Sequence, residues 1–361
     1  MALITFNHLE ICGITTVVPS LEKSIDQDVD QYKGGAPAVQ RIKDTIGVDR
    51  RRVVDSSVTA SDLCLHAAEK LLAELSIDRD AIDVMICVTQ TPDYSQPCNA
   101  AVLHGKLGLP KSCACFDVNM GCSGYVYGLW LAGSLVEQGM LQRVLLLAGD
   151  TISKCVNPRD KTVAPLFGDA GSATLVEYRE QATPSFFVLN TDGTGYDALI
   201  IPEGGFRNPV SENSKQAAKD GEGNWRRGND LHMKGGDVFN FTLREVPKAI
   251  LEVMDYARID KEEIDQFFLH QANPYILSNI AKRIKVPIEK VPCNVASKYG
   301  NQSSASIPGV IADTLGESKG DALRVLLSGF GVGLSWASAV LSLDPSVVFP
   351  VIRYPEETVT L

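Results

Sequence analysis

The feature that most constrains the fold of this chain is an internal duplication. The segment SIDRDAIDVMICVTQTPDY, which begins at Ser76, matches RIDKEEIDQFFLHQANPYI, which begins at Arg258, at an offset of about 182 residues. QRVLLLAGD matches LRVLLSGFG at nearly the same offset, and FDVNMGCSG lies opposite PCNVASKYGNQSSAS. Three matches in the same order indicate two halves that share a fold and pack about a pseudo-twofold axis. We place these halves at 1–180 and 181–361.

Each half alternates short apolar runs with helical patterns, which is typical of βαβ units in an α/β fold with a mainly parallel, buried sheet. We therefore predict five layers, αβαβα, in which a layer of buried helix separates two sheets. The predicted strands are 84–89, 114–118, 144–148, 172–176, 267–270, 291–295, 325–328 and 334–343. The predicted helices are 61–75, 99–107, 122–138, 238–256, 274–284 and 303–315.

One long segment departs from this rhythm. Residues 206–236 are polar, glycine-rich and charged, so we interpret them as a loop insertion in the second half and as the best candidate for a mobile lid. The end of the chain, 346–361, carries two prolines and is expected to lie on the surface.

Composition excludes several classes of protein. The net charge of −10 disfavours nucleic acid as a partner, and no apolar stretch is long enough to span a membrane. Residues 1–6 have neither the basic start nor the apolar run of a signal peptide. Nine cysteines without paired spacing predict free thiols and a cytoplasmic location. We expect no metal site, since no cysteine–histidine cluster has zinc-binding spacing.

Cys122 is the first candidate catalytic residue. It follows a predicted strand and precedes a segment, YVYGLWLAGSLVEQG, that is apolar nearly all round and so predicts a helix buried in a large core. Backbone N–H groups and the positive dipole end at a helix start stabilise an anion, and we expect them to ease deprotonation of this thiol. The plain alternative is that Cys122 is a small buried hydrophobic residue.

His270 and Asn301 are expected to join Cys122. In the duplicated frame, Asn301 lies just before a helix at the position that matches Cys122, and pseudo-symmetry brings the two helix starts together. His270 ends a predicted strand, where α/β folds usually carry catalytic groups. Taken alone, Asn301 can be a turn residue, His270 a structural group, and the glycines of GFGVG (329–333) a tight turn rather than a dinucleotide fingerprint.

At these positions the chain resembles the β-ketoacyl-acyl carrier protein synthase III family of the thiolase superfamily. The resemblance runs from about residue 9 to about residue 343. Its motifs are GCSGYVYGL, LHQANP, YGNQSSASIP and GFGVGLSWAS, supported by FGDAG and LHMKG. The resemblance implies a thiolase-like αβαβα fold, a homodimer, and an enzyme of the acyltransferase class without a cofactor.

The resemblance also implies roles for single residues. Cys122 would take an acyl group from acyl-CoA or acyl-carrier protein, with its own N–H and that of Val332 as the oxyanion hole. His270 and Asn301 would hydrogen-bond the thioester carbonyl of malonyl-carrier protein and stabilise the enolate formed when carbon dioxide leaves. Phe330 would crowd the malonyl carboxylate and favour its loss.

Several positions depart from the family pattern. The coenzyme A adenine clamp is replaced near Arg41 and Thr45, and a phosphate-binding arginine becomes Lys154. Tyr275 replaces a carrier-docking arginine, while basic residues remain at Lys282 and Arg283, where they can bind the acidic carrier or simply face solvent. Gln96 stands where an aromatic residue often reaches the partner's acyl pocket. A specialised relative, with a carrier-borne or more polar primer, is the resulting expectation.

Two functions remain open at this point. The first is decarboxylative condensation of an acyl-cysteine with malonyl-carrier protein, in fatty acid or specialised acyl or polyketide biosynthesis. The second is transfer of the acyl group to a hydroxyl or amine, with His270 as general base. An inactive partner subunit is disfavoured because Cys122, His270 and Asn301 are all present, and a degradative thiolase because Val332 stands where a second cysteine is required.

Overall fold

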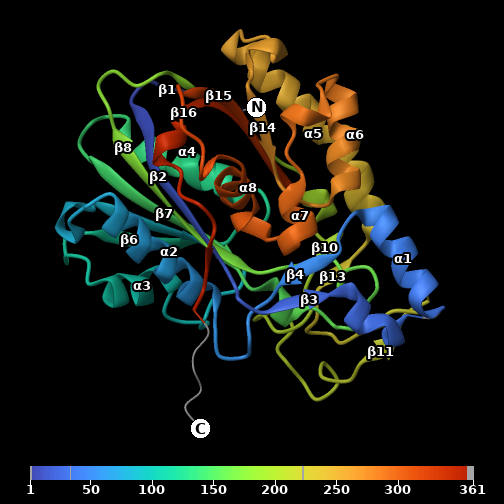
Figure 1. Ribbon diagram of the computed structural model, residues 1–361. Coiled ribbons are helices and arrows are strands. Elements are labelled where there is room, and N and C mark those ends of the chain that lie inside the picture. Colours follow the sequence, from blue (N-terminus) through green and yellow to red (C-terminus); the bar gives the residue numbers. More distant parts are fainter. Residues whose placement is uncertain (1, 33, 222, 356–361) are drawn as a thin grey trace.

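Two large β-sheets form the framework of the molecule, seen in a computed structural model that describes residues 2–32, 34–221 and 223–355 (Figure 1). The first sheet has the order β17-β2-β8-β7-β5-β6 and the second β1-β9-β16-β15-β14. The strands of the first are Ile352–Arg353, Leu9–Val18, Ala170–Tyr178, Arg143–Asp150, Val84–Val88 and Ala114–Val118, in that order. Those of the second are Ala2–Phe6, Ser185–Thr191, Ser335–Leu343, Leu323–Gly331 and Gln266–Leu269.

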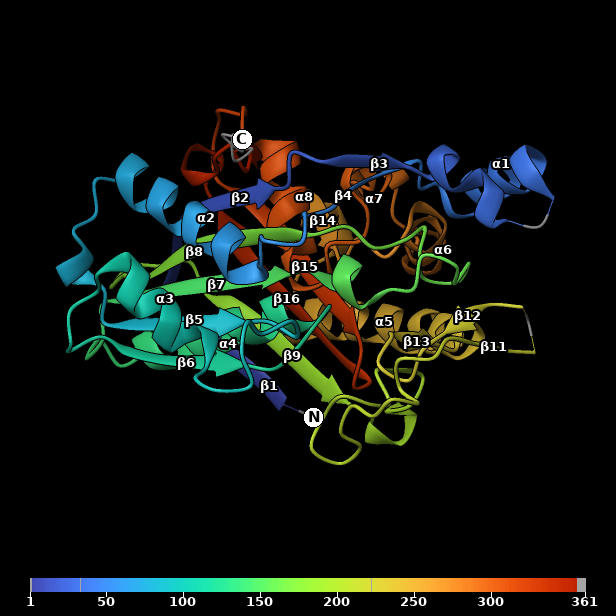
Figure 2. The same cartoon turned by 90° about the horizontal axis from the view of Figure 1, so that it is seen from below.

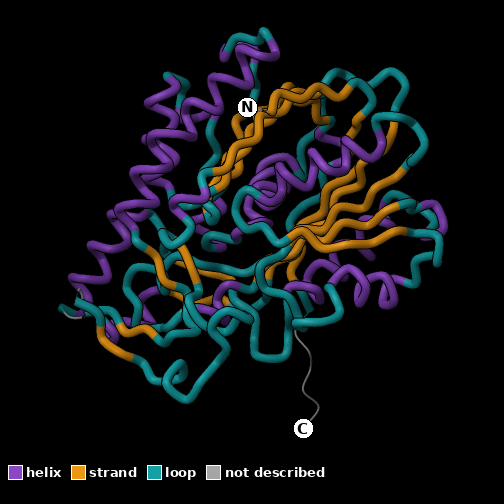
Figure 3. Tube along the Cα trace, turned by 180° about the vertical axis from the view of Figure 1, so that it is seen from behind, coloured by secondary structure: helices purple, strands orange, loops and turns teal. Residues whose placement is uncertain are grey.

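Helices complete five layers, and the predicted αβαβα architecture is confirmed. Helices α4 (Gly124–Val136) and α8 (Ser306–Leu315) lie between the two sheets, where Figure 3 shows them enclosed by strands. Helices α2 (Ala60–Glu74) and α3 (Asn99–Leu107) cover the outer face of the first sheet. Helices α5 (Gly235–Ala257) and α6 (Pro274–Ile284) cover the outer face of the second.

The sheets also show how the duplicated halves are joined. Strand β5 corresponds to β14, β7 to β15 and β8 to β16, in the same spatial order in both sheets. The chain ends are exchanged, since β1 belongs to the second sheet and β17 to the first. The division at 180 falls in the connection between β8 and β9.

Two predictions about the strands are wrong. The sheets are mixed rather than mainly parallel, because β15 and β16 are joined by a short turn that makes them antiparallel neighbours, and β7 and β8 are also antiparallel. Residues 291–295 are not a strand: Pro292 lacks the N–H that a sheet ladder needs, and the chain enters the short helix α7 (Asn294–Tyr299). The edge strand β6 therefore has no counterpart in the second sheet.

Smaller elements gather at one end of the molecule. Helix α1 (Gly35–Ile46) lies beside α6, and β3 (Glu22–Ser24) pairs with β4 (Arg50–Arg52) (Figure 1). The segment 206–236 lies at the same end, as Figure 2 shows for its strands. It carries β11 (Ala218–Lys219), β12 (Trp225–Arg226) and β13 (His232–Met233), the last paired with β10 (Leu199–Ile200).

This segment is tied to the first half by charged groups. The guanidinium of Arg226 lies 2.5 Å from the buried carboxylate of Asp160, and Asn157 donates to Asp230 at 2.9 Å. The segment is therefore more than the loop that the sequence predicted, since it contains short strands and contacts the first half. That it acts as a lid stays a prediction.

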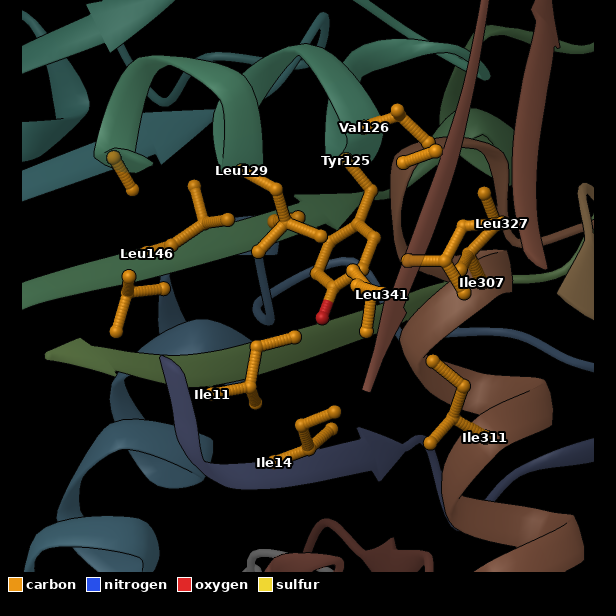
Figure 4. Close-up of a cluster of buried hydrophobic side chains, with 14 of the residues drawn as sticks. Ile11, Ile14, Tyr125, Val126, Leu129, Leu146, Ile307, Ile311, Leu327 and Leu341 are labelled. Atoms are coloured by element: carbon orange, nitrogen blue, oxygen red, sulfur yellow. The ribbon is translucent and has the colours of Figure 1, made fainter. Parts of the chain in front are cut away.

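The largest fully buried side chain of the central layer is Tyr125, on the first turn of α4. Its ring is fully buried among aliphatic side chains from both sheets and from α8 (Figure 4). Its hydroxyl lies 3.0 Å from the hydroxyl of Thr174 on β8, which satisfies both polar groups. Burial of this ring fixes the start of α4, directly after Cys122, against the first sheet.

We expect Tyr125→Ala to lower the free energy of unfolding by about 3–5 kcal/mol, the cost of deleting a buried aromatic ring. Tyr125→Phe keeps the ring and removes only the hydrogen bond to Thr174, so it should cost about 1 kcal/mol. Urea denaturation followed by circular dichroism measures both. Equal losses for the two variants would contradict this account of the core.

Candidate active site

The three predicted catalytic residues line one cavity of ≈ 580 Å³. Cys122 lies in the turn between β6 and α4, His270 directly follows β14, and Asn301 lies between α7 and the 3-10 turn Ser303–Ala305. All three side chains belong to buried residues. The two halves thus deliver a thiol, an imidazole and an amide to one point, as the duplicated frame predicts.

A close backbone contact between the halves positions Asn301. The N–H of Asn301 donates to the carbonyl of Leu166 at 2.8 Å, and its carbonyl accepts from the N–H of Gly168 at 3.0 Å. A Cβ at Gly300 would lie 2.7 Å from the nitrogen of Gly168, and Gly300 has a φ of 85°. Glycine is therefore required at this crossing, since a side chain would force the two backbones apart.

Cys122 is enclosed by the strand that carries the GFGVG motif. A Cβ on Gly331 would lie 2.7 Å from the Cβ of Cys122, so this glycine makes room for the cysteine. Burial has the largest effect on the pKa of the Cys122 thiol and raises it, whereas the side chain of Ser303 and the backbone N–H groups of Cys122 and Val332 lower it.

The expected ease of deprotonation of Cys122 is not borne out. Burial outweighs the N–H groups and raises the pKa of this thiol to about 12. Cys122 also lies in a turn two residues before α4 rather than on its first turn, so the dipole of that helix acts less directly than predicted. The thiol is therefore protonated at neutral pH, and its use as a nucleophile would require a group that accepts its proton.

His270 is held by a serine and an aromatic ring. Its Nδ1 lies 2.6 Å from Oγ of Ser306, and its ring packs edge-on against Phe330 with centroids 5.3 Å apart. Burial lowers the pKa of His270 to about 3, so the imidazole is neutral at physiological pH. Because Nδ1 faces Ser306, Nε2 is the ring nitrogen left for a ligand.

The amide of Asn301 has a defined orientation. The N–H of Ser303 donates to its Oδ1 at 3.0 Å. This bond leaves the NH₂ group of Asn301 available to donate a hydrogen bond into the cavity. A thioester carbonyl placed there would meet donors from both Asn301 and His270.

The remaining predicted site residues lie in different places. Phe330 lines the cavity, whereas Lys154 lines a neighbouring one and donates to the carbonyl of Ser56 at 3.1 Å. Lys282 and Arg283 are exposed near the end of α6. Gln96 is exposed, outside the lining of this cavity, on the loop before α3.

The outer wall of the cavity contains the positions that depart from the family pattern. Arg41 and Thr45 of α1 line it, together with Lys161. Tyr275 also lines it and stacks on Phe239 of α5, with centroids 5.9 Å apart and planes at 14°. Arg41 and Lys161, rather than Lys154, are the basic side chains that the first half contributes to this wall.

Three polar residues of the site were missed by sequence reasoning. Ser303 and Ser306 lie within the YGNQSSASIP motif, where only Asn301 was singled out, and Asp150 ends the repeated run QRVLLLAGD. Asp150 is fully buried, and its carboxylate accepts from the N–H and the hydroxyl of Ser304. An acidic residue at the end of a buried strand was the available signal.

Comparison with known proteins identifies the family. Residues 116–193 match the family described as 3-oxoacyl-[acyl-carrier-protein (ACP)] synthase III, and residues 254–343 match its C-terminal counterpart. A putative 3-oxoacyl-[acyl-carrier-protein] synthase 3 of Campylobacter jejuni is 36% identical over 355 residues, 98% of this chain and 99% of that protein. A beta-ketoacyl-[acyl-carrier-protein] synthase III of Streptococcus equi subsp. zooepidemicus is 35% identical over 84% of this chain and 90% of its own length.

A solved structure supports the same family assignment. The 3-oxoacyl-(acyl-carrier protein) synthase of Burkholderia xenovorans LB400 superposes with a TM-score of 0.91 at 40% identity and covers 98% of this chain and 99% of its own. The chain therefore belongs to the 3-oxoacyl-[acyl-carrier-protein] synthase III family and has its thiolase-like fold. Within the described residues, no helix combines the length and apolar character needed to cross a bilayer.

The low pKa of His270 predicts a specific pH dependence of stability. Unfolding returns the histidine to its ordinary pKa of 6.5, so between that value and about 3 the unfolded chain binds a proton that the folded chain excludes. Acid therefore destabilises the folded state through this residue. From pH 7 to pH 5 the wild type should lose about 2 kcal/mol more than His270→Gln. Urea titrations at both pH values measure this difference, and equal losses would show that His270 titrates normally.

Proposed function

We propose that this protein is a condensing enzyme that acylates Cys122 from an acyl thioester and extends the acyl group with malonyl-carrier protein by decarboxylation. The observation that carries the proposal is the convergence of Cys122, His270 and Asn301 in one cavity, with the N–H of Val332 directed at the sulfur. Membership of the synthase III family supports the same reading.

In the first step the sulfur of Cys122 attacks the thioester carbonyl. The developing negative charge on the carbonyl oxygen would be met by the N–H groups of Cys122 and Val332, which are already in place around the sulfur. Fixed backbone donors need no reorganisation when the charge appears. The donor thiol then leaves, and the acyl group stays on Cys122.

In the second step the malonyl thioester carbonyl would lie between Asn301 and His270. The NH₂ group of Asn301 donates. Nε2 of His270 would donate in the tautomer in which the Ser306 hydroxyl leaves the Ser303 carbonyl and turns its proton to Nδ1, 2.6 Å away. Both donors are neutral, so they favour the enolate that forms as carbon dioxide leaves rather than the malonyl carboxylate. The enolate carbon then attacks the acyl carbonyl carbon, the bond from that carbon to the Cys122 sulfur breaks, and the released thiolate takes up a proton. Phe330, packed against His270, would keep water from that carboxylate.

The low pKa of His270 favours condensation over the second function, transfer to a hydroxyl or amine. That transfer needs a general base, and a base works best when its pKa is near the working pH. Burial places the pKa of His270 at about 3, where it is a weak base but still a good hydrogen-bond donor.

We further propose that acyl carrier protein delivers the malonyl group, and that the protein works as a cytoplasmic homodimer. Exposed Lys282 and Arg283 on α6 offer positive charge to an acidic carrier, on the helix whose first residues line the cavity. The absence of the adenine-clamp residues at Arg41 and Thr45 favours a carrier-borne primer.

Intact mass spectrometry tests the two steps separately. Wild-type protein incubated with a panel of acyl donors should gain one acyl mass, and malonyl-carrier protein should then discharge it as a ketoacyl product. Cys122→Ala should form no adduct. Asn301→Ala should form the adduct at a near-normal rate and discharge it at least about 100-fold more slowly, since it loses a transition-state donor. An adduct that malonyl-carrier protein never discharges would make acyl transfer the leading function.

The open edge of β6 supports the homodimer and gives it a test. Within the part of the chain that the structure describes, this strand pairs only with β5, and its Phe116 is 37% exposed. We expect light scattering to give about twice the chain mass of 39.0 kDa, and Phe116→Lys to shift the protein toward the monomer, since a buried unpaired charge is costly. Met140→Lys, at a residue 83% exposed, is the matched control. A monomeric wild type would contradict the proposal.

A further inference from the structure

Ser303 has an uncommon backbone conformation at the centre of the site. Its φ is 49°, in the left-handed region that non-glycine residues rarely adopt, and the residue is buried. Such conformations persist when the surrounding structure over-determines them, and they cluster at functional sites. The contacts of Ser303 show what this conformation achieves.

The N–H, the carbonyl and the hydroxyl of Ser303 each contact a different residue of the site. Its N–H donates to Oδ1 of Asn301, and its carbonyl accepts from the Ser306 hydroxyl that also faces His270. Its own hydroxyl lies 3.9 Å from the sulfur of Cys122. The first two contacts use the backbone and would survive any side chain at 303, whereas the third depends on the hydroxyl.

A buried carboxylate lies on the other side of this hydroxyl. Asp150, at the end of β7, accepts hydrogen bonds from the N–H and the hydroxyl of Ser304. Burial raises the pKa of this carboxylate, and the side chain of the adjacent Ser303 is among the groups that lower it. The other partners of Asp150 are the N–H of Gln90 at 2.7 Å and the hydroxyls of Thr89 and Thr91. All of these hydrogen bonds come from neutral amide or hydroxyl groups. A buried carboxylate satisfied in this way is a stronger base than one in water, because burial raises its pKa.

We propose that Ser303 and Asp150 form a proton relay that activates Cys122 during acylation, with Ser303 as the bridge and Asp150 as the final acceptor. The proposal rests on the proposed function, because it supplies the base that the acylation step requires. His270 does not fill this place, since its imidazole holds a proton only weakly and its Nδ1 faces Ser306.

The relay balances protons and bonds. As the sulfur of Cys122 bonds to the thioester carbonyl carbon, the thiol proton passes to Oγ of Ser303 and the proton of that hydroxyl passes to the carboxylate of Asp150. When the tetrahedral intermediate collapses, the bond to the donor sulfur breaks. The proton returns by the same route to the departing thiolate, which leaves as a thiol. Ser303 and Asp150 end the step as they began.

Ser303→Gly is the decisive variant. Glycine adopts a φ of this sign without strain and keeps the backbone bonds to Asn301 and Ser306, so the variant should fold. We expect acylation of Cys122 in a single turnover to slow at least tenfold, and Asp150→Asn to slow it as well. Ser172→Ala, which removes a buried hydroxyl bonded to Ala148, is the matched control.

Two further readouts separate a relay from a structural role. A plot of the wild-type acylation rate against the deuterium fraction of the solvent should be curved, because two protons move during acylation. The same plot for Ser303→Gly should be linear. Alkylation of Cys122 by iodoacetamide, followed by peptide mass, should slow in Ser303→Gly and Asp150→Asn.

The outcomes distinguish the two proposals. If wild type forms no adduct with any donor, the proposed function fails, and alkylation alone decides whether Ser303 and Asp150 activate the thiol. If Ser303→Gly acylates and alkylates Cys122 at wild-type rates, the relay is overturned while the proposed function stands.

Discussion

The active site depends on one backbone contact between the two halves of the chain. Residues 299–301 pass so close to 166–168 that Gly300 and Gly168 leave no room for a Cβ, and two hydrogen bonds join Asn301 to Leu166 and Gly168. This crossing sets the position of the turn that follows. That turn contains Ser303, whose backbone and side chain reach toward all three predicted catalytic residues. A duplicated fold thus produces an asymmetric site, because the first half supplies Cys122 and the second supplies His270 and Asn301.

Burial determines the chemistry of that site. It raises the pKa of Cys122 to about 12 and lowers that of His270 to about 3, so both residues are neutral before substrate binds. A neutral site does not stabilise a charged ground state, and its fixed donors act mainly when charge develops in the transition state. The same burial creates a demand for a proton acceptor during acylation. The proposed relay assigns this role to Asp150, whose carboxylate is bonded to Ser304, the neighbour of Ser303.

The sequence correctly predicted the layers of the fold and the convergence of Cys122, His270 and Asn301 on one cavity. It did so because the duplication fixed which loops meet, and because apolar runs mark buried strands. It failed where local sequence is ambiguous. The segment 291–295 has the apolar content of a strand, but Pro292 and the following contacts make it the entry to α7. Prediction also failed for properties that depend on the three-dimensional surroundings of a residue. Neither the raised pKa of Cys122 nor the left-handed φ of Ser303 can be predicted from a local sequence pattern. Lys154 was selected by its place in a motif, and only three-dimensional structure shows that Lys161 lines the cavity instead.

The most direct test of this account is a crystal structure of the protein after reaction with an acyl donor. The account predicts continuous density from the sulfur of Cys122 to an acyl group whose carbonyl oxygen lies within hydrogen-bond distance of the N–H groups of Cys122 and Val332. The NH₂ group of Asn301 and Nε2 of His270 should face the empty part of the cavity where the extender binds. An acyl group on another residue, or a carbonyl oxygen directed away from Val332, would contradict it.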